Sequence, residues 1–426
     1  MLSKVLSVFS SPDLRKKILI VAFILFVSRL LANIPIPGIN ISLLQSFLDN
    51  NQALGLLNIF SGGALSNLSI AMLGIGPYIT ATIIMQLFTV IFPGLKAIYY
   101  EQGPEGRAKF NRYSRYITVP LAALQAYGLL KLLISQNVLP PLSGEQMLVD
   151  VLIATAGSMI LLWLGEIITE QKIGNGVSLL IFAGIVAGFP SLLFGAFDRF
   201  QGGELGIDTL VGFVAVAMVV ITGIVFVNES ERRVPVSYAK RIRGNKMYGG
   251  VSSYLPLKVN QAGVIPIIFA ISVLLFPQFF GQILAAIWPT VGLAVTNWFN
   301  GIINNQVIYG ALYFILVFIF TFFYTAVTFD PSEISKNLQR GGGFVPGIRP
   351  GESTAQFLKN VITRINVFGA TFLGLIAVLP IATRFLTKTD ALTVGGTAIL
   401  IVVAVALDTA KQIDSQLTVR EYENLN

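Results

Sequence analysis

The chain has 426 residues, of which 54% are hydrophobic and 12% are charged, and its formal net charge is +8. Soluble domains carry about 25% charged residues, so this composition predicts a protein that crosses a membrane several times. The chain contains no Cys and no His. Disulfides, thiolate chemistry, a His-ligated metal or haem and a Ser-His-Asp triad are therefore excluded.

Apolar segments of about 20 residues are long enough to cross a bilayer as helices. The sequence contains ten such segments, and no Asp or Glu lies near the middle of any of them. Ionisable groups at membrane depth are costly and are kept for function, so their absence argues against ion-coupled transport. The predicted spans are 18–35, 68–92, 116–135, 147–170, 176–195, 208–228, 260–285, 305–329, 361–383 and 393–410.

The first predicted span follows the basic segment Arg15-Lys16-Lys17 and ends in Ile34-Pro35-Ile36-Pro37-Gly38. A secretory signal peptide would instead end in a small-residue cleavage site soon after its apolar stretch. We therefore expect the first span to be a retained helix.

The next segment, residues 53–67, is moderately apolar but too short to span a bilayer, and Ser61-Gly62-Gly63 interrupts it. Non-helical backbone persists at membrane depth only where it is buried in protein or lines a wet cavity. A short re-entrant helix that blocks a vestibule fits this pattern, and so does an amphipathic helix on the outer surface. The sequence does not choose between them.

Lys and Arg concentrate before the first span and in the loops after spans two, six and eight. Such residues stay on the cytoplasmic side, so both termini are expected to face the cytoplasm and the number of spans must be even. The two largest cytoplasmic loops are then about 229–258 and 330–353.

Ten spans divide into two halves, residues 1–200 and 201–426, and an odd number of spans per half gives the halves opposite orientations. Breaks occur at matching positions: Gly74-Ile75-Gly76-Pro77 and Gly263-Val264-Ile265-Pro266 in the second spans, and Gly174-Asn175-Gly176 and Gly395-Gly396 in the fifth. Such matches indicate an inverted repeat with the functional interface between its halves. The alternative is that Gly and Pro are simply common in membrane helices.

The loop 229–258 alternates apolar and polar residues around a basic turn, which predicts a projecting β-hairpin. Tyr238, Tyr248 and Tyr254 lie among its Arg and Lys residues, a pattern that favours docking to RNA or to an acidic protein face. A basic loop without a partner is the alternative. Gly341-Gly342-Gly343 in the other loop lacks the Lys-Ser/Thr of a phosphate-binding loop, so we expect the energy source to be a partner.

Ile75, Ile79 and Ile83 repeat at helical spacing and share one helix face, and Val177 and Ile181 share another. Branched apolar side chains that line a constriction exclude water and ions by dewetting. Contact with lipid is the competing explanation for the same spacing.

Several runs are specific enough to identify a family. The chain resembles the SecY family, the large channel subunit of the Sec protein translocase, over nearly its whole length. The resemblance is carried by Phe60-Ser61-Gly62-Gly63-Ala64-Leu65, Leu73-Gly74-Ile75-Gly76-Pro77-Tyr78-Ile79, Ile173-Gly174-Asn175-Gly176-Val177-Ser178, Tyr238-Ala239-Lys240-Arg241, Leu257-Lys258-Val259-Asn260, Gly263-Val264-Ile265-Pro266 and Phe344-Val345-Pro346-Gly347-Ile348-Arg349-Pro350-Gly351.

The resemblance implies an all-α integral membrane protein with ten transmembrane helices in two pseudo-symmetric inverted halves and a short re-entrant plug helix at about 53–67. It implies a pore ring of Ile75, Ile79, Val177, Ile181, Ile268 and Ile401, a plug containing Phe60, Ser61, Gly62, Gly63, Ala64 and Leu65, and lateral-gate contacts at Thr80, Gln125 and Asn260. The residues expected to dock partners are Arg232, Arg233, Lys240, Arg241, Arg243, Lys246 and Arg349.

By the same resemblance, the protein passes unfolded secretory polypeptides across the bacterial plasma (inner) membrane and releases apolar segments sideways into the lipid bilayer. Its implied partners are the membrane subunits SecE and SecG, the motor ATPase SecA, the ribosome and the precursor polypeptides, with no cofactor and no catalytic residues. Val177 departs from the isoleucine that many relatives carry, and the short tail 416–426 leans acidic, which puts tail contacts with the ribosome in doubt.

Two other classes of function compete with the channel. A secondary transporter fits an inverted repeat equally well, and Arg29 within the first span leaves anion transport open. An intramembrane enzyme would need a catalytic set, and a Ser-Lys dyad would need a lysine at depth, whereas Lys131 lies near the end of a span.

Overall fold

The computed structural model describes residues 11–36, 44, 58, 61–100, 102–203, 206–238, 241–243, 246–248, 252–387 and 396–423. The helices are α2 (Pro12–Leu31), α5 (Gly76–Ile91), α6 (Pro93–Tyr100), α7 (Gly103–Ser135), α8 (Gly144–Glu170), α9 (Gly176–Gln201), α10 (Ile207–Glu229), α11 (Ile265–Ile287), α12 (Pro289–Asn304), α13 (Gln306–Thr328), α14 (Pro331–Arg340), α15 (Glu352–Thr387) and α16 (Gly396–Glu423). The strands are β1 (Glu231–Tyr238), β2 (Arg241–Arg243), β3 (Lys246–Tyr248), β4 (Ser252–Lys258) and β5 (Gly343–Phe344).

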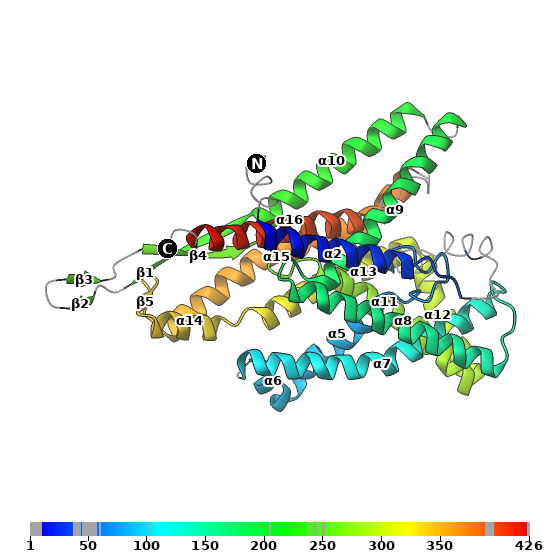
Figure 1. Ribbon diagram of the computed structural model, residues 1–426, viewed down its shortest axis with the longest axis horizontal. Helices are drawn as coiled ribbons and strands as arrows, with labels where there is room; N and C mark the ends of the chain where they lie inside the picture. The colour runs from blue at the N-terminus through cyan, green and yellow to red at the C-terminus, as the bar shows by residue number, and fades with distance from the viewer. Residues whose placement is uncertain are drawn as a thin grey trace.

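The long helices lie roughly side by side along the long axis of the molecule, and the strands project from one end (Figure 1). There β1 pairs with β4 and with β5, all antiparallel, in the order β4-β1-β5, and β2 pairs with β3 at the tip. The predicted hairpin-like projection of the loop 229–258 is therefore confirmed. At the other end, α10 and the end of α9 diverge from the body of the bundle (Figure 1).

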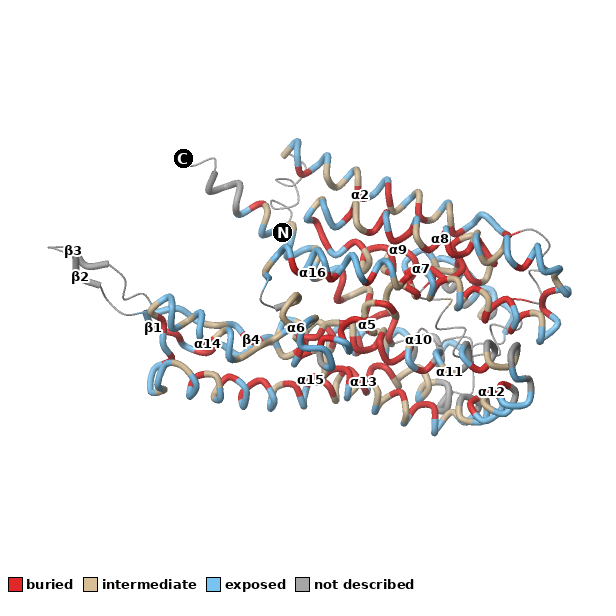
Figure 2. The backbone as a smooth tube through the Cα atoms, turned by 90° about the horizontal axis from the view of Figure 1, so that it is seen from below, coloured by how far each residue is buried: buried red, intermediate tan, exposed pale blue. Residues whose placement is uncertain are grey.

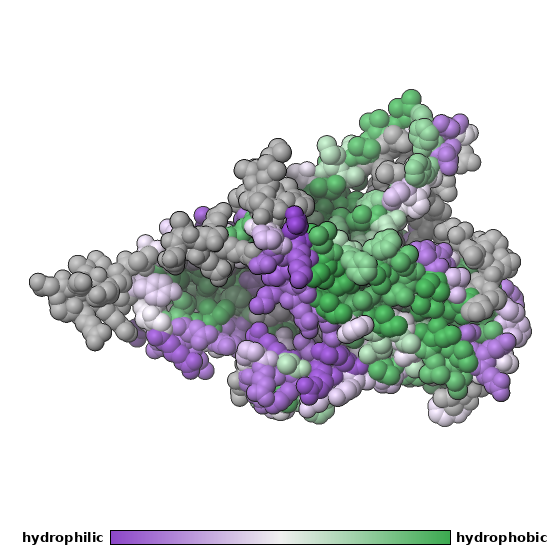
Figure 3. All heavy atoms as spheres, in the orientation of Figure 1, coloured by the Kyte–Doolittle hydropathy of each residue, from purple (hydrophilic) through white to green (hydrophobic). Residues whose placement is uncertain are grey.

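One apolar cluster fills the centre of the bundle, where the buried backbone concentrates in Figure 2. Small residues let its helices approach closely. A Cβ on Gly157 of α8 would lie 1.9 Å from the carbonyl oxygen of Ile70, and one on Gly176 of α9 would lie 1.8 Å from that of Gly165. Because a side chain at either glycine would collide with backbone, these two positions fix how α8 packs against its neighbours. The outer surface of the bundle carries broad apolar areas (Figure 3).

Four helical stretches among the described residues are long and apolar enough to cross a membrane: Gly103–Ser135, Gly144–Glu170, Gln306–Arg340 and Glu352–Thr383. Gly76–Thr89 and Pro93–Tyr99 qualify as a fifth if the pair, bent by 112°, counts as one span. Shorter apolar helices cover Gly176–Ser191, Val214–Glu229 and Ile265–Leu274. The architecture of packed apolar helices is confirmed, whereas the count of ten spans stays a prediction.

Three predicted boundaries differ from the structure. The second span, predicted over 68–92, is helical only from Gly76, and residues 62–68 and 70–75 before it form turns. The predicted loop between spans two and three contains α6 and the first turns of α7, which pack together through the rings of Tyr99 and Phe110, 4.8 Å apart. Residues between the predicted seventh and eighth spans form α12, which sequence patterns had not indicated.

Candidate functional site

The starts of α5 and α11 share one backbone geometry. Gly74 and Gly263 have φ of +57° and +62°, a region that glycine enters without the steric cost paid by other residues. Each is followed by an N-cap residue in nearly the same conformation, Ile75 (φ −97°, ψ 4°) and Val264 (φ −93°, ψ −8°). Proline then occupies the first helical turn of both helices, where its missing N–H has no consequence.

The six predicted ring residues come from these two helix starts and from α9 and α16. Ile79 and Ile268 each follow their break glycine by five positions, and Ile181 and Ile401 lie five positions after the glycines that open α9 and α16. The structure places all six in one apolar cluster, with Ile75, Ile181 and Ile401 buried and the other three partly buried. Among these four helices, α5 contacts α11 and α9 contacts α16.

The predicted plug is described at Asn58 and at residues 61–67, and Phe60 lies outside the described residues. Ser61 Oγ donates to the Asn58 carbonyl oxygen (3.0 Å) and accepts from the Leu65 amide (3.2 Å), and Asn58 Oδ1 accepts from the Ser66 amide (2.9 Å). Ala64 and Leu65 are fully buried in the central cluster. This burial favours a segment packed inside the protein over a helix on its surface.

Arg29 of α2 holds the same segment from the side. Its Nη1 donates to the carbonyl oxygen of Gly62 at 2.9 Å. Gly62 has φ of +69°, and a Cβ there would lie 2.2 Å from Arg29 Nη1 and 2.5 Å from Cα of Gly184 on α9. No side chain other than hydrogen fits at this junction. Arg29 stands out in the sequence as a charge within a predicted span, but spacing along the chain does not indicate its partner.

Two of the three predicted gate residues are brought together. Gln125 Nε2 on α7 donates to Thr80 Oγ1 on α5 at 3.4 Å. Asn260 lies elsewhere, in the turn before α11, where its Nδ2 donates to Asn228 Oδ1 of α10 (2.8 Å) and to the Gly263 carbonyl oxygen (3.3 Å). Asn260 Oδ1 is buried and has no hydrogen-bond partner in the described part of the chain.

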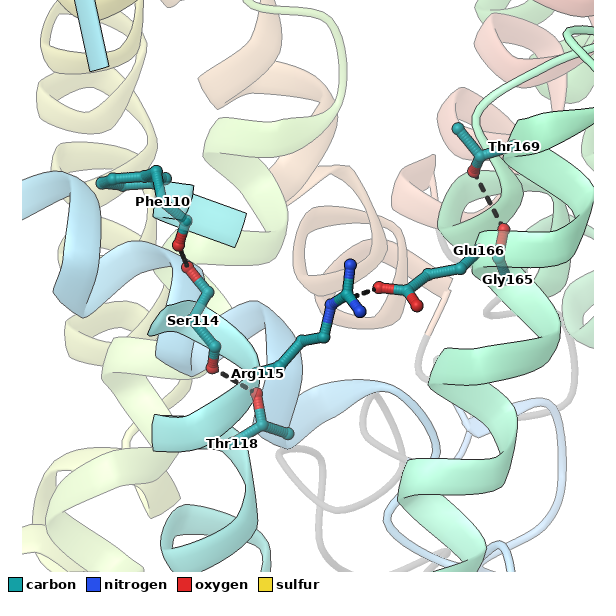
Figure 4. A network of polar contacts seen from close by, with 7 residues as sticks. All are labelled: Phe110, Ser114, Arg115, Thr118, Gly165, Glu166 and Thr169. Carbon is teal, nitrogen blue, oxygen red and sulfur yellow. Dashed lines mark hydrogen bonds and ion pairs between the residues drawn. The ribbon is translucent and has the colours of Figure 1, made fainter. Parts of the chain in front are cut away.

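Asn260 borders a small polar cavity of about 80 Å³ between α10, the turn before α11, and α16. Across it, Lys411 Nζ pairs with Glu229 Oε1 at 2.8 Å, which ties α16 to the end of α10. A second ion pair lies in the N-terminal half, where Arg115 Nε of α7 meets Glu166 Oε1 of α8 at 2.7 Å (Figure 4). Each pair links neighbouring helices within one predicted half.

The docking residues lie on the projecting sheet and beside it. Arg232 and Arg233 are exposed on β1, Arg241 and Arg243 belong to β2, Lys246 belongs to β3, and Lys240 lies outside the described residues. Arg349 is exposed in the turn between β5 and α15, and its carbonyl oxygen accepts from Thr354 Oγ1 at 2.8 Å. Because β5 pairs with β1, the two predicted cytoplasmic loops form one surface.

Comparison with known proteins supports the family resemblance found in the sequence. A model of the SecY family matches residues 69–410. The protein translocase subunit SecY of Streptomyces scabiei is 45% identical over 447 residues, with 99% of each chain covered, and that of Mycobacterium tuberculosis is 41% identical over 448 residues, again with 99% of each covered.

Solved structures with the same fold include one described as a protein conducting channel, with a TM-score of 0.64, 18% identity, and 92% of this chain and 90% of that one covered. A second concerns the plug domain of the SecY protein, which stabilises the closed state of its channel, with a TM-score of 0.62, 20% identity and the same coverage. A third is Sec61 in the canine ribosome-channel complex, with a TM-score of 0.61, 18% identity and the same coverage. Because these three structures are at most 20% identical to this chain, the likeness to them establishes the fold alone.

Proposed function

Because the chain belongs to the SecY family of protein translocase subunits, we propose that it forms the channel through which unfolded secretory polypeptides cross a bacterial plasma membrane. The observation that carries the proposal is the cluster of Ile75, Ile79, Val177, Ile181, Ile268 and Ile401, contributed by the starts of four helices. We assign residues 1–200 and 201–426 to the two halves, with this ring between them.

The ring acts as a gasket. Its branched apolar side chains exclude water and ions from a narrow waist by dewetting. The same side chains can pack around an extended polypeptide of any sequence because apolar contact has no directional requirement. A channel of this kind keeps its seal while a chain passes.

The segment around Gly62 closes the path at rest. It is held by the Arg29 hydrogen bond and by backbone contact with Gly184, and Leu65 is buried beside it. Displacement of this plug requires the loss of one charge-assisted hydrogen bond and of the packing around Leu65. The cost is modest for an entering polypeptide yet sufficient to favour the closed state when none is present.

Lateral release occurs at the seam where α11 meets α5 and α7. Separation of α11 from these helices would open the waist towards lipid. Apolar segments of the substrate then leave the path sideways, because each buried CH₂ group gains about 0.8 kcal/mol in hydrocarbon. Thr80 and Gln125 stabilise one side of this gate, and Asn260 steadies the turn that starts α11 on the other.

The energy comes from partners that dock on the surface formed by β1, the β2–β3 tip and Arg349. Its basic residues suit an acidic or phosphate-rich partner, and we assign SecA and the ribosome to it. The neighbouring Sec61 structure is described as part of a ribosome-channel complex. SecE and SecG are the assigned membrane partners, both termini face the cytoplasm, and the chain itself performs no catalysis.

A cysteine crosslink tests the proposed path directly, since the chain has no Cys of its own. A precursor with one cysteine is stalled in mid-passage through the Ile181→Cys variant, and we expect a disulfide between the two. The matched control is Leu152→Cys on α8, which is apolar, helical and exposed on the outer surface. A precursor shown to be in transit that crosslinks at residue 152 and not at residue 181 would contradict the channel.

A further inference from the structure

The hairpin formed by α11 and α12 is held by direct backbone contact. A Cβ on Gly292 of α12 would lie 2.0 Å from the amide nitrogen of Ala285 on α11. One on Gly281 of α11 would lie 2.6 Å from Thr296 Oγ1, which donates to the carbonyl oxygen of Gly292 at 2.8 Å. With so little between the two backbones, α12 moves together with the second half of α11.

This hairpin is apolar on its exposed side. Residues 259–329 contain no Asp, Glu, Lys or Arg. Trp288 lies exposed at the turn between the helices, and Val291 and Trp298 are exposed on α12, the latter by 70%. Exposed apolar areas of this kind mark contact with a partner or with a membrane.

The position of the α11–α12 hairpin in the molecule indicates what its exposed apolar side contacts. In both Figure 1 and Figure 2, α12 lies at the end of the molecule opposite the β2–β3 tip. It contacts α13, whose first turn continues the exposed apolar surface with Val307 and Ile308. Since α13 lies in a stretch long and apolar enough to span a membrane, the surface of α12 is continuous with a lipid-facing one.

We infer that α12 lies in the headgroup region of the leaflet on the side away from the basic loops, with Trp288, Val291 and Trp298 in contact with lipid. Tryptophan favours this region because its ring is apolar and its indole N–H is polar. The exposed surface of α12 combines apolar Val291 and Trp298 with polar Asn297, and a helix with both kinds of residue can lie at the boundary between lipid and water. The inference rests on the proposed membrane channel and adds a lipid anchor to the helix that carries Ile268.

The consequence for the gate follows from the backbone contact. The far half of α11 cannot leave its place without carrying α12 through the headgroup region. Lipid contact at α12 therefore holds one end of α11, and the segment near Gly263 is left as the end that moves.

Tryptophan fluorescence tests the inference, because the chain has three tryptophans, Trp163, Trp288 and Trp298. The full chain with Trp163→Phe and Trp288→Phe is placed in vesicles whose lipids carry bromine near the headgroups or near the bilayer centre. We expect a roughly twofold larger loss of Trp298 fluorescence with headgroup-proximal bromine. A variant that keeps only Trp163, exposed on α8 within a span, is the positive control for lipid access.

Three results would overturn the inference. Stronger quenching of Trp298 by bromine at the bilayer centre would place α12 within the hydrocarbon. Quenching by aqueous iodide and not by brominated lipid would place it in water. Resistance to both quenchers would show that another protein chain covers it. None of these results bears on polypeptide passage, which the Ile181 crosslink measures independently.

Discussion

The starts of α5 and α11 are alike in backbone and different in support. Both have a glycine with positive φ, an N-cap residue of almost the same conformation and a proline in the first turn. The start of α5 follows the buried segment that Arg29 and Gly184 hold in place. The start of α11 follows β4 and is fastened by the pair of Asn260 with Asn228.

The difference shows how one geometry can serve two tasks. Movement of the plug bears directly on α5, because only the turns up to Ile75 separate them. Movement of the sheet formed by β4, β1 and β5 bears directly on α11, because β4 ends at Lys258 and α11 begins at Ile265. We therefore expect perturbations on the α5 side to change closure and perturbations on the α11 side to change the response to partners.

The largest effect is expected from Arg349→Glu, on the side of α11. Reversing an exposed charge at the docking surface replaces attraction to an acidic partner with repulsion. Translocation into membrane vesicles should be blocked while the protein still inserts and assembles. Arg340→Glu, an equally exposed change on α14, is the control and should retain transport. Normal export by the Arg349 variant would remove this loop from partner docking.

The second-largest effect is expected from a substitution at Gly62, in the segment that precedes α5. Gly62→Val places a branched side chain at positive φ where a Cβ lies 2.5 Å from Gly184 Cα, so the plug cannot keep its position. Such strain and overpacking cost on the order of 3 kcal/mol. Planar-bilayer recordings should show ion leakage without substrate.

Gly63→Ala is the matched control for that variant. Gly63 also has positive φ (+80°), but the nearest atom to a Cβ there is 3.9 Å away. Strain without a clash should cost about 1 kcal/mol and leave the membrane largely sealed. Equal leakage in both variants would mean that backbone strain, and not the junction with Gly184, governs closure.

A smaller effect is expected from polar substitutions of the ring residues, and it should be the same on α5 and on α11. Ile79 and Ile268 occupy the same position relative to their break glycines, so Ile79→Asn and Ile268→Asn should both ease opening by wetting the waist. Export of a precursor with a defective signal segment should rise in each, and Ile401→Asn should behave alike. Ile267→Val loosens the core beside the ring without adding polarity and should leave selectivity unchanged. Unchanged selectivity in the asparagine variants would refute the gasket.

The smallest effect is expected at the pair that fastens α11. Asn260→Ala removes the part-buried hydrogen bonds to Asn228 and to the Gly263 carbonyl oxygen and should lower stability by about 1 kcal/mol. A double-mutant cycle with Asn228→Ala, followed by thermal denaturation in detergent, measures the coupling between the two residues. Additive losses would show that the 2.8 Å contact contributes no coupling and that Asn228 does not fasten the start of α11.

Local signals in the sequence predicted the helices and their breaks well. Long apolar segments located the bodies of α8, α13 and α15, and Gly74 and Gly263 were expected as breaks before their positive φ was seen. The length of an apolar segment and the preference of glycine for positive φ are properties of short segments, so they can be recognised in the sequence itself. The six ring residues were expected from the family resemblance and not from spacing; they lie in the central apolar cluster, and their role as a pore ring stays a prediction.

Contacts between distant segments were not accessible in the same way. The bond from Arg29 to Gly62 depends on how α2 lies beside the plug, and the partner of Asn260 depends on the path of α10. No pattern indicated α12, because it is too short to span and is separated from two long apolar segments only by single-residue breaks. These features are set by packing, which a single sequence does not reveal.

The pairing of β5 with β1 has a consequence for protein engineering. Tyr238 faces Gly343 across the sheet, and a Cβ on that glycine would lie 2.9 Å from the tyrosine ring. A chimaera can receive the 229–258 segment from a distant homologue while keeping its own 330–353 segment. Its β1 and β5 strands would then come from different proteins, and the residues at the Tyr238–Gly343 contact would not fit each other. Grafts of this surface should therefore transplant both segments together.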